Sequence, residues 1–266
     1  MKPVELIEKC RSGIAQIFLE SERERIGSGS AFIVDGGIVT NRHNLRSIPF
    51  DTFVIRFEND KNNDSGNEIR LLSKNCMDLI VAESSEDEKD FVYIRLSEPE
   101  LNGRHIFELS DSSSLSVGEQ VVFMGYPFSS PHLTAHIGYV SSLHQSNGVE
   151  IIQIDGSVNS GNSGGPLIDL KTGKVAGIIT RAETGLLREQ FDRLLQALKD
   201  NQRILQRQQQ SGAIISIGGI DPIGAIRASQ VAMEQIVIQL RRSANVGIGF
   251  AFSAQYVKDE VPCLQK

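Results

Sequence analysis

The stretch GNSGGPL, residues 161–167, says more about the fold than any other part of the chain. It places Ser163 between glycines, and a hydroxyl can attack a carbonyl only when a tight turn presents it to the substrate. Glycines permit such a turn because they adopt backbone angles that other residues avoid. An ordinary Gly/Ser turn explains a bare GxSxG pattern equally well, but the full run is more specific. Ser163 is therefore the candidate nucleophile.

A nucleophilic serine needs a general base, and the chain has five histidines, namely His43, His105, His132, His136 and His144. Only His43 has a distinctive setting, because two strand-like runs meet a turn there and the sequence Thr-Asn-Arg leads directly into the histidine. A histidine without such a setting is more often a surface or core side chain. The setting favours His43 as the candidate general base.

Residues 12–182 are built from short apolar or alternating runs that Gly, Asn, Asp and Ser interrupt. This pattern predicts many short strands, at residues 14–19, 29–34, 37–40, 52–57, 78–83, 91–96, 120–125, 133–142, 149–154, 165–169 and 174–180. Such spacing is typical of a β-barrel or sandwich rather than of alternating strands and helices.

The pattern changes between residues 183 and 242, where glycines become rare and apolar residues recur at helical spacing. The first predicted helix carries Leu187, Phe191, Leu194, Leu195, Leu198 and Leu205. The second is expected to begin at Asp221-Pro222, since an N-cap acceptor precedes a proline at the first helical position. Residues 211–220 would join the two helices in an antiparallel hairpin. Residues 245–261 then resume the strand pattern, so the helices interrupt the β domain.

These segments together resemble the trypsin-like serine peptidases, and within them the bacterial HtrA (DegP-like) proteases. The resemblance rests on GSGSAFIVDGGIVTNRHNL (27–45), KDFVYIRL (89–96), IQIDGSVNSGNSGGPLID (152–169), KVAGIIT (174–180) and NVGIGFAFS (245–253). It implies an all-β fold of two packed six-stranded β-barrels, with a helical-hairpin insertion in the C-terminal barrel. The expected N-terminal barrel is residues 1–110, the C-terminal barrel is residues 111–182 and 243–266, and the insertion is residues 183–242.

The family's order of His, Asp and Ser locates the third member of a catalytic triad. Its segment after the histidine has a strand, a turn, and then an aspartate before alternating apolar residues. Asp90 fits that position best, with Asp87 second and Asp78 third, because the acidic turn leaves the register open. Its expected role is to accept the second N–H of His43 and to stabilise the imidazolium. A solvent-exposed surface aspartate is the alternative.

The resemblance also implies an oxyanion hole at Gly161, Asn162 and Ser163, with the donors being the backbone N–H groups of Gly161 and Ser163. Asn162 replaces the aspartate that digestive relatives pair with a freed N-terminus, so activation by propeptide cleavage is not expected.

The residues that the family uses for substrate binding correspond to Ser157, Val158, Ile178, Ile179 and Thr180. No acid stands at the base of this expected P1 pocket, which disfavours Arg or Lys at P1. The prediction is a small or medium apolar P1 residue such as Ala, Val or Leu.

Composition excludes several classes of function and location. The net charge of -6 disfavours a nucleic-acid or anionic-membrane partner, and no apolar run is long enough to span a bilayer. Cys10, Cys76 and Cys263 do not suggest a disulfide framework, and the first residues lack a signal-peptide core. A cytoplasmic location is therefore expected. Neither the cysteines nor the histidines cluster as metal ligands, and no phosphate-binding glycine loop is present, so no metal or cofactor is expected.

The insertion has no counterpart in the family, whose members pass through a short loop there and mostly carry a PDZ domain afterwards. We expect no PDZ domain in this chain. Residues 183–242 are either a decoration on the barrel or a surface for a regulatory protein partner or for self-association. The leading function is a serine endopeptidase that acts on protein or peptide substrates. The alternative is a catalytically silent peptide-binding or assembly subunit.

Overall fold

In the computed structural model, the chain forms two compact units, residues 1–182 with 247–266, and residues 183–246. We call them the sheet unit and the hairpin unit. The structure describes residues 2–46, 48–58, 68–86, 88–110, 114–180, 185–210, 221–243 and 247–265. The expected insertion, residues 183–242, falls within the hairpin unit.

The N-terminal half of the sheet unit is a seven-stranded antiparallel sheet in the order β5-β4-β1-β2-β3-β7-β6. Its strands are β1 (Ile14–Ser21), β2 (Glu24–Val34), β3 (Gly37–Thr40), β4 (Thr52–Phe57), β5 (Glu68–Leu72), β6 (Ile80–Ser84) and β7 (Phe91–Arg95). The expectation of a closed six-stranded barrel here is wrong. The chain leaves β5 directly into helix α3 (Ser73–Asp78) instead of turning back into a hairpin, so β5 and β6 become the two edges of an open sheet.

The C-terminal half is a closed barrel of six strands in the order β10-β13-β12-β11-β8-β9, which confirms the second predicted barrel. Its strands are β8 (Gln120–Gly125), β9 (Thr134–Ser146), β10 (Val149–Asp155), β11 (Pro166–Asp169), β12 (Val175–Thr180) and β13 (Ile248–Ser253). Strands β12 and β13 pair from Gly177 opposite Ser253 to Thr180 opposite Phe250. The helices therefore interrupt a connection between two paired strands, as the sequence predicted.

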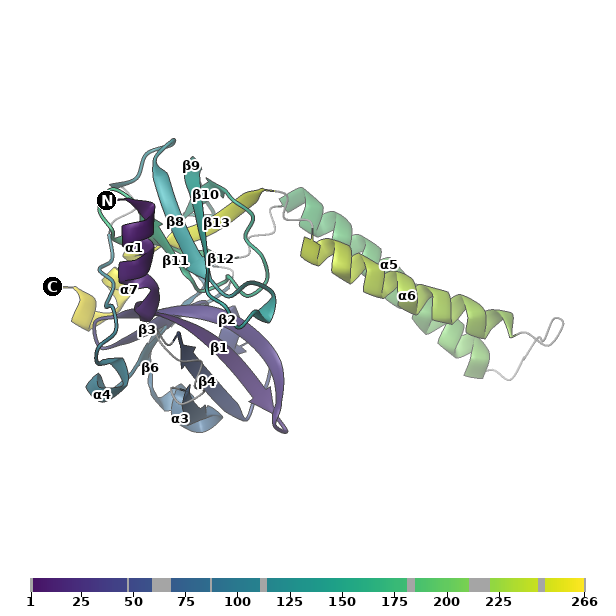
Figure 1. Ribbon diagram of the computed structural model, residues 1–266. Helices are drawn as coiled ribbons and strands as arrows, with labels where there is room; N and C mark the ends of the chain where they lie inside the picture. The colour runs from purple at the N-terminus through teal and green to yellow at the C-terminus, as the bar shows by residue number, and fades with distance from the viewer. Residues whose placement is uncertain are drawn as a thin grey trace. The chain divides into compact units, whose positions relative to one another are not determined.

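Short helices complete the sheet unit (Figure 1). Besides α3, they are α1 (Pro3–Cys10), α2 (His43–Arg46), α4 (Glu98–Leu101) and α7 (Gln255–Glu260). Sequence patterns did not predict α1, which buries Leu6 and Cys10 on one side. One hydrophobic cluster joins the two sheets, since it contains Phe32 and Phe91 from the open sheet together with Met124 and Ile178 from the barrel. This shared core fixes the sheets against each other, and with them the residues at their junction.

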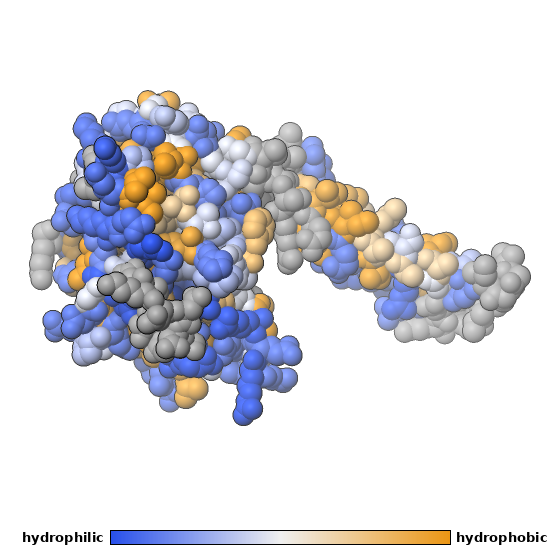
Figure 2. Space-filling model, in the orientation of Figure 1, coloured by the Kyte–Doolittle hydropathy of each residue, from blue (hydrophilic) through white to orange (hydrophobic). Residues whose placement is uncertain are grey.

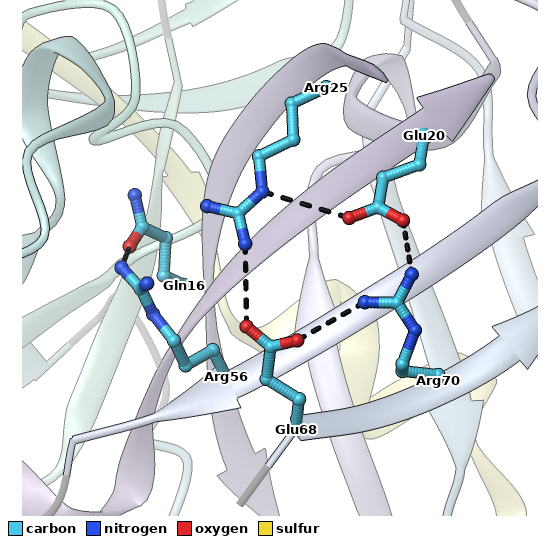
Figure 3. A network of polar contacts seen from close by, with 6 residues as sticks. All are labelled: Gln16, Glu20, Arg25, Arg56, Glu68 and Arg70. Carbon is cyan, nitrogen blue, oxygen red and sulfur yellow. Dashed lines mark hydrogen bonds and ion pairs between the residues drawn. The ribbon is translucent and has the colours of Figure 1, made fainter. Parts of the chain in front are cut away.

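A network of polar side chains lies on the face of the open sheet formed by β1, β2, β4 and β5 (Figure 3). Arg25 contacts Glu68 at 3.4 Å and Glu20 at 3.7 Å, and Arg70 bonds both glutamates. The Arg25 guanidinium also stacks over the Phe18 ring, 3.8 Å from its centroid. These side chains come from alternate strand positions, so the opposite face carries the apolar core.

The hairpin unit contains two long helices, α5 (Gly185–Gln210) and α6 (Pro222–Ser243), which lie side by side in Figure 1. The Asp221 carboxylate accepts the N–H of Ile223, which confirms the predicted N-cap of α6. The predicted connection, residues 211–220, lies outside the described residues. Among the described residues of the helices, Leu198 and Val237 alone are buried. No helix in the part of the chain that the structure describes is long and apolar enough to cross a membrane.

Candidate active site

His43 and Asp90 meet between the ends of two neighbouring strands. β3 ends at Thr40, His43 begins α2, and Asp90 directly precedes β7, which pairs with β3. His43 Nδ1 lies 2.7 Å from Asp90 Oδ2, and the backbone N–H of His43 donates to Asp90 Oδ1 over 3.1 Å. An ionised carboxylate only accepts, so Nδ1 carries the proton in this contact and Nε2 is the basic nitrogen of the ring.

Asp90 is held by several further hydrogen bonds. Its side chain is buried, and the Thr180 hydroxyl donates to Oδ2 over 3.1 Å. Its backbone φ is +45°, an uncommon value for a residue with a side chain. The Asn41 side chain donates to the Asp90 carbonyl over 2.8 Å, and the Asp90 N–H donates to the Ser85 carbonyl over 2.9 Å. These contacts stabilise a conformation that the isolated chain would disfavour.

The three aspartates weighed from the sequence have different locations. Asp90 lies in hydrogen-bond contact with His43. Asp78 is the last residue of α3, and Asp87 lies outside the described residues.

Ser163 lies on a turn between Gly161 and Gly164, whose φ angles are +98° and +86°. The Ser163 carbonyl accepts the backbone N–H of Ser30 over 2.9 Å and the Asn44 side-chain amide over 3.0 Å. A Cβ added to Gly164 would lie 2.2 Å from the Ser30 carbonyl oxygen. The turn therefore packs so closely against β2 that only glycine fits, which explains the glycine that follows the serine in the motif.

His43 and Ser163 line the same cavity, whose volume is about 220 Å³. The cavity lies at the junction of the two sheets, because its lining comes from β1, β2, α2 and the turn that carries Ser163. The other lining residues are Leu19, Gly27, Ser28, Asn44, Ile48, Ser160 and Gly161. The structure thus brings together a serine, a histidine and a carboxylate from three distant segments, next to a space open to a ligand.

One backbone N–H group expected near the oxyanion hole takes part in a hydrogen bond within the turn. The N–H of Asn162 donates to the Asn159 carbonyl over 3.0 Å, so it is used within the turn. The Asn162 side chain is fully buried, and its amide atoms have no hydrogen-bond partner among the residues that the structure describes. The N–H groups of Gly161 and Ser163, the other residues expected at the oxyanion hole, take no part in the bond between Asn162 and Asn159.

The residues expected at a P1 pocket are mostly buried. Val158 and Ile179 belong to one hydrophobic cluster, and Ile178 belongs to the cluster that joins the two sheets. Ser157 accepts the N–H of Gly247 over 3.2 Å, and a Cβ on Gly249 would lie 2.5 Å from Val158 Cγ2. Thr180, expected among the substrate-binding residues, instead donates its hydroxyl to Asp90.

Sequence reasoning did not identify Ser30, Asn41 and Asn44 as part of the site. All three lie in GSGSAFIVDGGIVTNRHNL, from which only His43 was assigned a role in the site. Asn41 and Asn44 flank the histidine, and their side chains bond Asp90 and Ser163 respectively. Polar residues next to a candidate base were the available signal.

Comparison with known proteins places this geometry in a family. The model of the trypsin-like peptidase domain matches residues 27–178, more than half of the chain. A probable periplasmic DegP-like serine endoprotease of Hahella chejuensis is 34% identical over 168 residues, which cover 61% of this chain and 31% of that protein. The chloroplastic Protease Do-like 1 of Arabidopsis thaliana is 34% identical over 164 residues, covering 58% and 33%. The chain thus spans about a third of the length of these relatives.

Solved structures agree on the fold. The HtrA-type protease AlgW with a tripeptide has a TM-score of 0.58 at 19% identity, over 97% of this chain and 62% of that chain. A serine endoprotease from Yersinia pestis has a TM-score of 0.52 at 20% identity, over 68% and 57%. Together with the match to residues 27–178, the site geometry leads to one conclusion: this chain belongs to the family of trypsin-like peptidase domains, with HtrA and DegP-like serine proteases among its relatives.

Proposed function

We propose that this chain is a serine endopeptidase in which Ser163 is the nucleophile, His43 the general base and Asp90 the carboxylate that orients the histidine. The observation that carries the proposal is the 2.7 Å contact between His43 Nδ1 and Asp90 Oδ2, made by a histidine that shares a cavity with Ser163. Asp90 fixes the tautomer in which Nε2 can accept a proton.

In the acylation step, Ser163 Oγ attacks the carbonyl carbon of the scissile peptide bond while His43 Nε2 takes the hydroxyl proton. The carbonyl oxygen becomes an oxyanion, which accepts hydrogen bonds from the N–H groups of Gly161 and Ser163. The C–N bond then breaks, and His43 donates its proton to the leaving amine. Asn162 is not assigned as a donor, because its N–H already bonds the Asn159 carbonyl.

In the deacylation step, a water molecule takes the place of the leaving amine. His43 Nε2 accepts a proton from the water, whose oxygen attacks the acyl carbon. The bond to Ser163 Oγ breaks, His43 returns the proton to the serine, and the product acid leaves.

Labelling with a fluorophosphonate tests the proposal. The wild-type chain should be modified on Ser163, Ser163→Ala should not react, and His43→Ala should react slower by orders of magnitude. His144→Ala is the matched control, since His144 is an exposed histidine of β9, and it should react like the wild type. Absence of wild-type labelling would refute the proposal and favour a catalytically silent peptide-binding or assembly subunit.

We further propose that the enzyme prefers a small or medium apolar residue at P1. Two features support this: the expected pocket wall is apolar where Val158 packs closely on Gly249, leaving no room for a Cβ there, and the nearby Ser157 carries no charge. Cleavage of a peptide library should give Ala, Val or Leu at P1. Dominance of Arg or Lys at P1 would refute the preference.

The hairpin unit supports a proposal about assembly, in which two copies of the chain associate through it. Ile226, Met233 and Leu240 of α6 recur every seven residues, and each is at least half exposed. Seven-residue spacing is typical of helices that pack along a seam against other helices. Figure 2 shows apolar residues gathered along the hairpin helices. A second copy fits this stripe, because an uncharged face meets itself without charge repulsion and paired hairpins form a four-helix bundle.

Sedimentation of point variants tests this association. Ile226→Glu and Met233→Glu should convert a dimer to a monomer, because each would bury a charge in the seam. Gln235→Glu is the matched control, since it adds the same charge at an exposed position elsewhere on α6. A wild-type chain that is monomeric at all concentrations would refute self-association and favour a different regulatory partner.

A cytoplasmic location also remains a proposal. Its support is that Cys10, Cys76 and Cys263 are all free thiols. Fractionation of the native cell tests this location. Detection of the chain in a secreted or periplasmic fraction would contradict it.

A further inference from the structure

Ser30, in the middle of β2, is a fully buried polar residue that touches the nucleophile turn at two points. Its backbone N–H donates to the Ser163 carbonyl over 2.9 Å, and its hydroxyl donates to the Gly161 carbonyl over 2.6 Å. The same hydroxyl accepts the N–H of Tyr126 over 3.0 Å. One side chain of the open sheet thus links the turn that carries Ser163 to the segment that follows β8.

That segment makes a second contact with the turn. The N–H of Phe128 donates to the Ser160 carbonyl over 2.6 Å. The C=O and N–H of a trans peptide point in opposite directions, so this bond turns the N–H of Gly161 away from Phe128. The carbonyls of residues 160 and 161 are therefore both fixed, one by Phe128 and one by Ser30, and the Gly161 peptide cannot rotate without breaking one of these bonds.

Gly161 needs such fixing because its own backbone is permissive. A Cβ at this position would lie 2.2 Å from the Tyr126 carbonyl oxygen, so the site requires glycine. Glycine rotates more freely than any other residue, and a donor N–H that is not preorganised stabilises an oxyanion poorly.

Hydrogen bonds also maintain the segment that presents Phe128. Phe128 and Ser129 have φ angles of +55° and +58°, which residues with side chains rarely adopt. The Phe128 ring is 72% exposed, so burial of the ring does not hold this conformation. The Ser129 hydroxyl lies 2.6 Å from the Ser28 hydroxyl, and the N–H of Tyr126 bonds Ser30. Ser28 and Ser30 both belong to β2, and the Ser30 hydroxyl also donates to the Gly161 carbonyl in the nucleophile turn.

We propose that Ser30 is a positioning residue for the oxyanion hole. Its hydroxyl holds the Gly161 carbonyl directly, and through Tyr126 it holds the segment whose Phe128 N–H fixes the Ser160 carbonyl. Both bonds keep the N–H of Gly161 directed toward the reacting carbonyl oxygen. This role rests on the proposed peptidase function, and it concerns how the transition state is stabilised rather than how the substrate is bound.

Kinetics of Ser30→Ala test the role. The variant should lower kcat on a peptide substrate about 100-fold, the effect of losing one oxyanion donor, with KM changed less than about threefold. Binding of a peptide aldehyde, which forms an oxyanion with Ser163, should weaken by a similar factor. The matched control is Ser110→Ala, which removes another buried serine hydroxyl, bonded to the Val175 carbonyl. A purely structural role would lower kcat equally in both variants, or in neither, and would overturn the proposal.

Amide hydrogen exchange provides a test that does not require activity. The N–H groups of Tyr126 and Phe128 should exchange faster in Ser30→Ala than in the wild type, and should not change in Ser110→Ala. Equal exchange in the wild type and Ser30→Ala would overturn the positioning role even if the wild type fails to react with a fluorophosphonate. If Ser30→Ala does not fold, Ser30→Cys keeps the size with a weaker donor and should show the same changes to a smaller extent.

Discussion

The sheet unit and the hairpin unit use their apolar residues in opposite ways. In the sheet unit, apolar side chains fill three buried clusters, and the polar groups of the candidate site are fixed by hydrogen bonds that cross between strands. In the hairpin unit, Leu198 and Val237 are the buried residues among those described, while Met233 and Ile236 are more than half exposed. The sheet unit therefore fixes the side chains of the candidate site, whereas the hairpin unit exposes apolar side chains on its surface. Substitutions should therefore affect chemistry in one unit and association in the other.

The largest expected effect comes from Asp90→Asn. The amide is nearly isosteric but no longer favours the His43 tautomer that leaves Nε2 basic, so kcat should fall about 10⁴-fold. Steady-state hydrolysis of a peptide substrate measures it. Asp169→Asn is the matched control because Asp169 is also a buried aspartate at a strand end, and it should keep near wild-type kcat. Equal losses in the two variants would mean that Asp90 has only a structural role.

A backbone substitution in the nucleophile turn should have the next largest effect. In Gly164→Ala, the new Cβ would lie 2.2 Å from the Ser30 carbonyl oxygen and from Thr40 Oγ1, so the turn must move. A displacement of about 1 Å costs about 100-fold in rate. Gly148→Ala is the control, because Gly148 also has a positive φ but no atom within 4 Å of the added Cβ. Labelling at the wild-type rate in Gly164→Ala would contradict this account of the turn.

Thr180→Val should have a moderate effect, since it removes one of the hydrogen bonds to the Asp90 carboxylate. A bond to a charged acceptor contributes about 1.5 to 3 kcal/mol, and because Asp90 keeps its other bonds the loss should lie at the low end, which is a drop in kcat/KM of roughly tenfold. Thr172→Val removes a similar bond, from Thr172 Oγ1 to Asp169 Oδ2 at 2.7 Å, and should leave kcat/KM unchanged. A substrate-binding role for the Thr180 side chain predicts instead a rise in KM at constant kcat.

The stability of the sheet unit should depend on pH through His136. Burial lowers the pKa of His136, whose ring stacks on Phe123 with centroids 4.6 Å apart. In the unfolded chain, His136 therefore binds a proton near pH 6.5, and in the folded chain it binds that proton only at lower pH. The free energy of unfolding should therefore fall as pH decreases below about 6.5. Denaturant unfolding at pH 7.5 and 5.5 measures this, and His136→Phe should reduce the pH dependence while His132→Phe, at an exposed position, should not.

The smallest expected effect on chemistry comes from the hairpin unit. Replacing both Leu198 and Val237 with Ser should lower the helical circular dichroism signal, because each removes a buried side chain from a thin interface. The rate of Ser163 labelling should stay within about twofold of the wild type. A large drop in labelling would contradict the division of roles between the two units, since it would mean that the helices contribute to the active site.

Much of the sheet unit could be predicted because its strands are marked by local patterns. The nucleophile turn follows from a short motif, and the family resemblance implied that β12 and β13 belong to one barrel. In the hairpin unit, the N-cap of α6 at Asp221 also follows from a short motif. The open sheet could not be predicted, since closure depends on how β5 and β6 lie on either side of α3 (Ser73–Asp78), and the sequence patterns predicted neither that helix nor β5. The strand β5 was missed although Glu68, Ile69, Arg70 and Leu71 alternate between polar and apolar residues, so that alternation was an available signal.

The details of the site were harder to predict than its main residues. Ile178 and Ile179 were expected at substrate-binding positions from the family resemblance, but only packing decides that their side chains enter hydrophobic clusters. Ser30 lies 131 residues from the carbonyl that its hydroxyl bonds, and no local pattern connects two positions so far apart.

In the proposed mechanism, Ser163 forms a covalent intermediate with the help of His43 and Asp90. Mass spectrometry of the intact chain, quenched in acid during turnover of an activated ester, tests it most directly. We predict a mass increase equal to one acyl group, located on Ser163 by peptide mapping and absent in Ser163→Ala. Ester turnover by the wild type without any acyl adduct, or with the adduct on another residue, would contradict the mechanism.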